Sequence, residues 1–330
     1  MKDKKLPKKE LGFFPTPLVE LYRLSETLDG PRILMKRDDQ TGLALGGNKT
    51  RKLEFLVGEA VERGCDTLIT GGAAQSNHCR QTAAAAAASG LPCHLVLGGT
   101  PPEIVDGNLL LDYLFGANIH WSGEFRKGET IPEVAEQLEQ DGFKPYVIPY
   151  GGSNATGAAA FVYAAAELQD QLYDMSIEVS HVLFASSSGG TQAGLVLGAY
   201  MFNQPFKLIG IGIEKGETGE DSLEVQVMNI ANSTAKRLKV DTQFSLEDIT
   251  VNNDYIGEGY GIVGELERRA IRLMAETEGI LLDPVYTGRA MGGLIDMIKR
   301  SEISRNDIVL FWHTGGVPAL FPYSAELISA

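Results

Sequence analysis

The feature that most constrains this chain is a regular alternation of short apolar strands with longer helical segments. Strands alternating with helices form parallel sheets covered by helices on both faces, so the fold class is α/β. In such sheets, ligands bind beyond the carboxyl ends of the strands. The expected strands are 33–36, 67–70, 94–97, 119–121, 146–148, 182–184, 208–213 and 308–312. The expected helices are 51–63, 77–89, 109–115, 132–140, 158–172, 191–201, 223–238, 263–278 and 291–299.

The composition excludes several classes of function. The chain has 330 residues and a net charge of −14, which repels nucleic acid and anionic membrane surfaces. It has no run approaching the ~18 apolar residues that span a bilayer, and no apolar stretch of a secretory signal follows the basic start. The five histidines are scattered and the three cysteines form no C-x-x-C pair, so neither a metal site nor a disulfide framework is expected. We expect a cytoplasmic protein.

Two glycines, Gly46 and Gly47, precede Lys49 at the expected start of a helix. The glycines allow unusual backbone angles and a close approach to a ligand. Burial, the helix N-terminus and the nearby Arg51 and Lys52 would lower the pKa of an amine there, as a Schiff-base lysine requires. Most lysines are solvated surface groups, so the spacing alone leaves both interpretations open.

A second turn carries Ser76, Asn77, His78 and Cys79 at the start of another expected helix. The free N–H groups of a helix start suit a substrate carboxylate, although Ser76 or Asn77 could equally be a simple cap. His78 could be a general base or a structural histidine. Cys79 is interpreted as structural, because no Asn or Asp that would orient a thiol nucleophile can be identified.

A third turn follows the strand at 182–184 and opens the helix at 191–201. It is rich in hydroxyls and glycines: Ser186, Ser187, Ser188, Gly189, Gly190 and Thr191. Backbone N–H groups in such a loop form an anion site. The loop is neither G-x-G-x-x-G nor a P-loop, so it favours a single phosphate group over a nucleotide. Tyr286-Thr287 and His313-Thr314 could add hydroxyls to the same cleft or be only turns.

Taken together, these segments resemble the fold-type II pyridoxal-phosphate enzymes, and more narrowly the D-cysteine desulfhydrase and 1-aminocyclopropane-1-carboxylate deaminase family. The matching stretches are 36–39, 46–54, 75–78 with Arg80 and Gln81, 151–154, 188–194, 259–261, 282–286 and 313–316. The resemblance implies a tryptophan synthase β-like fold of two open, twisted, mostly parallel sheets flanked by helices. It also implies a small domain at 52–160, a large cofactor domain at 1–51 and 161–330, and a homodimer.

The resemblance also implies the role of each site residue. Lys49 holds pyridoxal 5'-phosphate as a Schiff base and removes the α-proton of the substrate. Asn77 bonds the phenolic oxygen of the cofactor, and Thr314 its ring nitrogen. The phosphate is held by Ser188, Gly189, Gly190 and Thr191. The substrate carboxylate is received by Ser76, Asn77 and His78, while Tyr260, Tyr286 and Thr287 face the substrate; Tyr286 or Tyr260 assists the leaving group.

Two positions favour β-elimination over cyclopropane opening. The cyclopropane deaminases look to have Glu after the tyrosine that matches Tyr286. They also look to have Leu at the position of Thr314. Here the residues are Thr287 and Thr314. A neutral hydroxyl does not stabilise a pyridinium, so the ring is a weaker electron sink. A good β-leaving group such as thiolate or sulfite can still depart from such a site.

The expected reaction is therefore the conversion of D-cysteine to pyruvate, ammonia and hydrogen sulfide. Segments 41–43 and 257–261 also look like the L-cysteate sulfo-lyase branch, whereas 286–291 looks like the D-cysteine branch. L-Cysteate sulfo-lyase is the second choice and the deaminase the third. A non-catalytic amino-acid or phosphate-binding module is the alternative of another class; Lys49 argues against it, because mere binding needs no amine there.

Overall fold

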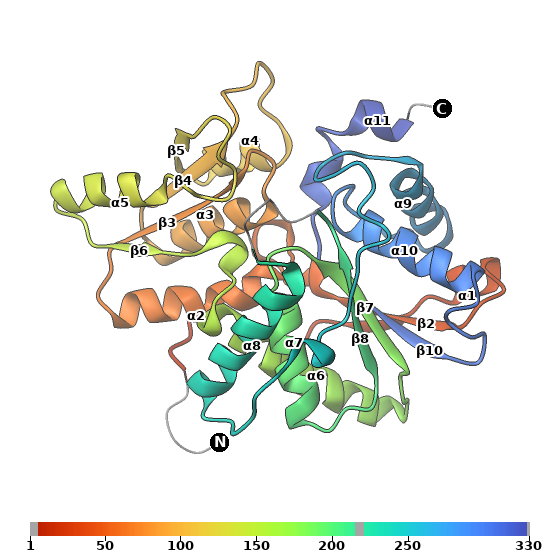
Figure 1. Cartoon of the computed structure of the whole chain (residues 1–330). Coiled ribbons are helices and arrows are strands. Elements are labelled where there is room, and N and C mark those ends of the chain that lie inside the picture. Colours follow the sequence, from red (N-terminus) through yellow and green to blue (C-terminus); the bar gives the residue numbers. More distant parts are fainter. Residues whose placement is uncertain (1–5, 215–220, 329–330) are drawn as a thin grey trace.

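The computed structural model describes residues 6–214 and 221–328. Two sheets, each flanked by helices, form two lobes side by side, with the four-stranded sheet in the orange and yellow lobe (Figure 1). The six-stranded sheet lies in the other lobe and combines strands from both ends of the chain.

The six-stranded sheet has the order β1-β2-β10-β7-β8-β9. Its strands are β1 (Leu18–Glu20), β2 (Arg32–Arg37), β7 (His181–Ser186), β8 (Lys207–Gly212), β9 (Val251–Asn252) and β10 (Ile308–His313). All neighbours are parallel except β1 and β2. The central strands are almost wholly buried, as expected for a parallel sheet covered on both faces.

The four-stranded sheet is entirely parallel and has the order β5-β4-β3-β6. Its strands are β3 (Thr67–Ala73), β4 (Cys93–Gly98), β5 (Asn118–Trp121) and β6 (Pro145–Val147). The most central strand, β3, is buried nearly throughout and ends beside the second of the predicted turns. The carboxyl end of this sheet therefore contributes that turn to the space between the lobes.

The helices cover both sheets and pack against one another between the lobes. They are α1 (Tyr22–Thr27), α2 (Lys49–Glu62), α3 (Asn77–Ser89), α4 (Gly107–Leu114), α5 (Ile131–Gln140), α6 (Ala155–Met175), α7 (Gly190–Met201), α8 (Leu223–Leu238), α9 (Glu265–Glu278), α10 (Thr287–Lys299) and α11 (Ser324–Ile328). Short 3₁₀ turns are η1 (Asp38–Gln40), η2 (Leu43–Leu45), η3 (Tyr150–Gly152), η4 (Leu246–Asp248) and η5 (Val317–Leu320). Helix α2 packs against both α3 and α6, so it links the two lobes.

The predicted α/β class with two mostly parallel sheets is confirmed. The expected strands and helices are present, with ends displaced by a few residues. Four helices and strands were not expected: β1, α1, β9 and α11. Each is short, from two to six residues, and too short to show the periodicity on which sequence prediction depends. The domain division at 52–160 stays a prediction.

Apolar side chains from both lobes form separate buried clusters. One fills the space between α2, α3 and the four-stranded sheet, and includes Leu56, Cys79 and Leu95. Another packs α9 and α10 onto the six-stranded sheet. No helix within residues 6–214 and 221–328 has the length and apolar character needed to cross a membrane. The same residues contain no cluster of three or more metal-binding side chains.

Candidate active site

A pocket opens where the carboxyl ends of strands from both sheets face each other. It encloses about 610 Å³ counted out to its open mouth. Its lining comes from the three turns that the sequence singled out, together with η3, the N-terminal end of α10 and the segment after β10. The lining residues are Asn48, Lys49, Ser76, Asn77, His78, Tyr150, Gly151, Ala185, Ser186, Ser187, Ser188, Gly189, Thr191, Tyr286 and Thr314.

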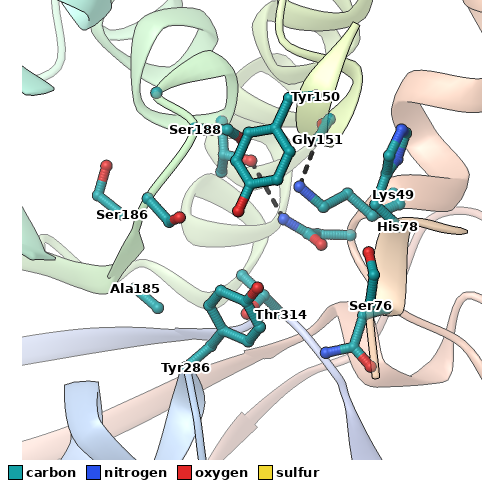
Figure 2. Close-up of a pocket in the computed structure, with 15 residues that line it drawn as sticks. Lys49, Ser76, His78, Tyr150, Gly151, Ala185, Ser186, Ser188, Tyr286 and Thr314 are labelled. Atoms are coloured by element: carbon teal, nitrogen blue, oxygen red, sulfur yellow. Dashed lines mark hydrogen bonds between the residues drawn. The ribbon is translucent and has the colours of Figure 1, made fainter. Parts of the chain in front are cut away.

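Lys49 is the first residue of α2 and extends into this pocket from the side of that helix (Figure 2). Gly46 and Gly47 have φ angles of 72° and 132°, which L side chains rarely adopt. A Cβ on Gly46 would also collide with the carbonyl oxygen of Asp39. The two glycines therefore allow the sharp entry into α2. The Lys49 Nζ donates a hydrogen bond to the Gly151 carbonyl oxygen at 3.1 Å.

Burial in the pocket lowers the pKa of Lys49 to about 8. An amine with this pKa is partly neutral near neutral pH, as a nucleophilic lysine requires. The expectation that Arg51 and Lys52 lower this pKa is wrong: Arg51 does not contribute to the shift, and the contact with Lys52 raises the pKa of Lys49. Two residues along a helix turn the side chain by about 200°, so Arg51 points away from the pocket and into an ion-pair network with Asp38 and Glu167.

Lys52 also belongs to the site, although the sequence motifs did not predict it as a residue that binds an anion. It lies one turn after Lys49 on the same face of α2, which is the spacing that could have revealed it. Its fully buried Nζ donates to the Gly151 carbonyl at 3.0 Å and to the Ser153 Oγ at 3.1 Å. Burial, and then the charge of Lys49, hold its pKa well below the ordinary value.

The serine and glycine loop lies beside Lys52 at the start of α7. Gly189 caps this helix with φ 77°, and the Gly190 N–H donates to the Ser153 Oγ at 3.1 Å. A Cβ on Gly190 would lie 2.6 Å from that oxygen and 2.9 Å from the Lys52 Nζ, so glycine is needed here. The Ser188 and Ser153 hydroxyls are 2.8 Å apart. Hydroxyls, helix-start N–H groups and a cation therefore converge at one point.

The same convergence extends to the side of the loop nearest α2. The Thr191 Oγ1 accepts a hydrogen bond from the Asn48 Nδ2 at 3.1 Å, which joins the start of α7 to the residue preceding Lys49. Among the described residues, neither Lys49 nor Lys52 forms an ion pair with a carboxylate. A half-buried amine and a fully buried amine without a carboxylate partner, next to a helix start, form a site for an anion such as a phosphate group.

The second turn holds its side chains in fixed orientations. The Ser76 Oγ accepts from the Cys79 backbone N–H and caps α3, which confirms the capping interpretation and keeps Ser76 at the pocket wall. The Asn77 Oδ1 accepts from the Arg80 Nη1 at 3.1 Å and from the Asn108 Nδ2 at 3.0 Å. Because its oxygen is engaged twice, the Asn77 Nδ2 is the atom that can donate to a ligand.

His78 and Cys79 are held in states that do not suit acid–base or nucleophilic roles. The Thr70 hydroxyl donates its only proton to the Ile148 carbonyl at 2.8 Å and lies 3.0 Å from the His78 Nε2. The His78 proton is therefore on Nε2, and burial keeps its pKa well below the ordinary value. Burial also raises the pKa of the Cys79 thiol, which supports its structural interpretation.

Two tyrosines meet on the side of the pocket opposite Lys49. The hydroxyls of Tyr260 and Tyr286 are 2.8 Å apart, and Tyr286 belongs to the pocket wall (Figure 2). Burial, and then neighbouring tyrosines, raise the pKa of both well above the ordinary value, so both are neutral. Tyr150, from η3, also reaches into the pocket and was missed, because no local pattern marks a tyrosine in an irregular loop (Figure 2).

The two threonines take different positions. Thr314 lines the pocket. Thr287 is fully buried: its Oγ1 donates to the Asp283 Oδ1 at 2.8 Å, and Asp283 also accepts from the backbone N–H groups that begin α10. The structure therefore does not bring the Thr287 side chain to the pocket as expected. Having Thr at position 287 means only that this position provides no carboxylate.

The pocket has the parts that pyridoxal 5'-phosphate requires. The anion site around Lys52 and Ser188 suits the phosphate, and the Lys49 amine suits the aldehyde carbon. The Asn77 Nδ2 and the Thr314 hydroxyl supply polar partners for the phenolic oxygen and the ring nitrogen. The donor set thus fits this cofactor, with Asn48, Lys52 and Ser153 as supporting residues beyond those expected.

Comparison with known proteins agrees with this geometry. Residues 9–315 match the family described as pyridoxal-phosphate dependent enzyme. A D-cysteine desulfhydrase of Klebsiella pneumoniae (strain 342) is 45% identical over 330 residues, which covers 98% of each chain. A D-cysteine desulfhydrase of Klebsiella pneumoniae subsp. pneumoniae is 44% identical over the same lengths.

Of two similar solved structures, one bears on the family and the other on the fold. The crystal structure of an ACC deaminase homologue is similar with a TM-score of 0.89 and 36% identity, covering 98% of this chain and 96% of that one. Threonine deaminase isoform 2 from Solanum lycopersicum has a TM-score of 0.64 at 18% identity, covering 96% and 88%, and this likeness shows the fold alone. The chain therefore belongs to the fold-type II pyridoxal-phosphate dependent enzymes, in the family of D-cysteine desulfhydrase and ACC deaminase.

Proposed function

We propose that the protein catalyses α,β-elimination on a small sulfur amino acid, with D-cysteine as the preferred substrate and pyruvate, ammonia and hydrogen sulfide as products. The observation that carries this proposal is the absence of any carboxylate among the residues that line the described pocket. Thr314 offers only a neutral hydroxyl to the ring nitrogen, which favours a reaction that needs a modest electron sink. The identity to two D-cysteine desulfhydrases supports the same substrate.

Binding of the substrate carboxylate is assigned to the start of α3. The Ser76 hydroxyl and the unpaired N–H groups of the first turn provide donors there. The His78 side chain is engaged with Thr70, so His78 contributes its backbone N–H rather than its ring. This placement leaves the α-carbon between the Lys49 amine and the two tyrosines.

The bound pyridoxal ring spreads the negative charge that develops on the α-carbon when its proton leaves. Lys49 is the base that takes this proton, because its lowered pKa of about 8 keeps part of the amine neutral. Lys52, Ser188, Gly189, Gly190 and Thr191 hold the phosphate, and Asn77 fixes the orientation of the ring. These assignments rest on the contacts described above and on the family resemblance.

The Tyr286 hydroxyl is assigned as the proton donor to the departing sulfur. It is neutral, lies on the pocket wall opposite Lys49, and is bonded to the Tyr260 hydroxyl at 2.8 Å. A hydroxyl pair can pass a proton from one oxygen to the other as the thiolate leaves. Tyr260 then supports Tyr286 rather than contacting the sulfur first, since Tyr286 belongs to the pocket wall.

A substrate panel tests the proposal. Purified holoenzyme is offered D-cysteine, L-cysteine, L-cysteate and 1-aminocyclopropane-1-carboxylate, and sulfide, sulfite, pyruvate and 2-oxobutyrate are measured. We expect sulfide and pyruvate from D-cysteine at the highest kcat/KM. Sulfite from L-cysteate would transfer the assignment to a sulfo-lyase. Release of 2-oxobutyrate as the main product would refute the argument from Thr314.

The assembly and location of the protein stay predictions. We expect a homodimer, which sedimentation or light scattering of the holoenzyme measures directly. A cytoplasmic location is also expected from the sequence, and fractionation of cells tests it.

A further inference from the structure

Arg126 joins the two lobes at the tyrosine side of the pocket. It lies in the loop between β5 and α5, and its Nη2 is 2.5 Å from the Glu214 Oε2, just after β8 of the other sheet. The Glu214 Oε1 accepts in turn from the Ser187 hydroxyl at 3.3 Å, and Ser187 lines the pocket. An ion pair between the lobes therefore ends at the pocket wall.

The same arginine covers the ring of Tyr260. Its guanidinium carbon is 4.7 Å from the centre of the Tyr260 ring, a distance at which a cation is attracted to the ring face. The Tyr260 hydroxyl bonds Tyr286 at 2.8 Å. One side chain thus contacts both the acid on the opposite lobe and the ring whose hydroxyl supports the proposed proton donor.

The loop that carries Arg126 is anchored to the four-stranded sheet. Gly99 and Gly123 exchange two backbone hydrogen bonds, at 2.6 and 3.1 Å, just beyond the end of β4. A Cβ on Gly98 would lie 2.6 Å from the Arg126 Cβ, so the loop packs directly on the strand. Arg126 is therefore expected to move together with the lobe that contains the four-stranded sheet.

We propose that Arg126 is a positioning residue that assembles the Tyr260–Tyr286 pair when the two lobes close over the substrate. With the lobes together, Glu214 fixes the guanidinium and the guanidinium fixes the ring of Tyr260. With the lobes apart, the ring loses that support and its hydroxyl is no longer directed at Tyr286. The inference rests on the proposed elimination, in which this pair supplies the proton to the leaving group.

A double-mutant cycle tests the coupling. We expect Arg126→Ala to lower kcat roughly 10- to 100-fold with a KM change of about twofold or less, since ring orientation matters after binding. Arg126→Lys, which keeps the ion pair but loses the planar group, should restore part of kcat. In a Tyr260→Phe background, Arg126→Ala should lower kcat by about twofold or less. Arg269→Ala, at an exposed arginine paired with Glu265, is the matched control.

A second measurement needs no turnover. Trypsin cleaves after Arg126 and Lys127, and the rate reports how often the loop leaves the opposite lobe. We expect Glu214→Gln to speed this cleavage at least about fivefold, whereas Glu265→Gln leaves it unchanged. The inference would be overturned if the fold-changes in kcat of Arg126→Ala and Tyr260→Phe simply multiply in the double variant. An unchanged cleavage rate in Glu214→Gln would overturn it as well. Faster cleavage in a protein that eliminates none of the panel substrates would refute the proposed function alone.

Discussion

The two faces of α2 carry basic side chains that differ in ion pairing and in the direction of their pKa shifts. On the pocket face, Lys49 and Lys52 have no carboxylate partner among the described residues, and burial holds the pKa of both below the ordinary value. On the opposite face, Arg51 bonds Asp38 at 2.8 Å and Glu167 at 2.8 and 2.9 Å. Burial opposes the charge of Arg51 too, but these two acids outweigh it and raise the pKa.

The difference shows how position on one helix divides reactivity from stability. Buried cations that are fully paired are structural, because their desolvation is compensated. Buried cations that are left unpaired are costly unless a ligand supplies the anion, and they deprotonate readily. Residues one and two positions apart therefore serve opposite purposes. The comparison predicts that variants on one face change chemistry and variants on the other change stability.

The largest effect is expected from Lys49→Ala. Removing the amine removes both the covalent attachment point and the base, so kcat/KM should fall roughly 10³-fold or more. The melting temperature should stay close to that of the wild type without cofactor, because the Gly151 carbonyl keeps its hydrogen bond from Lys52. After borohydride reduction, peptide mapping of the wild type should find the label on Lys49. A label on Lys52 instead would exchange the roles of the two amines.

A large loss of stability is expected from Arg51→Leu. It leaves Asp38 and Glu167 buried with too little positive charge, which costs about 3–5 kcal/mol in comparable buried pairs. Denaturant unfolding measures the free energy, and any folded fraction should still show the absorbance of bound cofactor. Arg51→Lys is the control, since it keeps the charge and loses the bidentate contact. Stability unchanged in Arg51→Leu would break the comparison.

Glu167 supplies a pH test of the same face. Burial opposes its charge, but Arg51 and Lys36 lower its pKa to about 2. A depressed folded-state pKa gives stability that is present above the unfolded value, near 4.3, and is lost as pH falls toward 2. The loss is at most about 3 kcal/mol at one carboxyl. The free energy of unfolding of Glu167→Gln, measured at each pH from 5 to 2, should therefore depend less on pH than that of the wild type.

A smaller effect is expected from Lys52→Met on the pocket face. Losing one charge-assisted contact of about 1.5–3 kcal/mol should weaken binding of pyridoxal 5'-phosphate to the apoprotein by roughly 10- to 100-fold. Pyridoxal, which lacks the phosphate, is the matched ligand control, and its affinity should not fall. Absorbance titration measures both. Equal weakening for the two ligands would show that Lys52 does not contact the phosphate.

Local signals in the sequence were enough to predict the architecture and to mark the candidate turns of the site. The alternating strands and helices, the turn before Lys49 and the loop around Ser188 are each encoded in a few neighbouring residues. Periodicity and glycine backbone freedom depend on neighbours along the chain, so they can be read without the fold. The family resemblance added the cofactor, and the comparisons confirmed it.

The sequence by itself thus determined the fold class and, through the family resemblance, predicted Lys49 as the reactive lysine, while the tertiary structure decided which side chains surround it. Tyr150 and Arg126 come to the pocket or its rim only because separate elements converge there, whereas Lys52 follows Lys49 on the same face of α2. Thr287 turns to Asp283 and Arg51 to Asp38, against the expectation for both. The physical reason is that orientation and charge compensation depend on which partners the folded chain brings within reach, which no periodic pattern specifies.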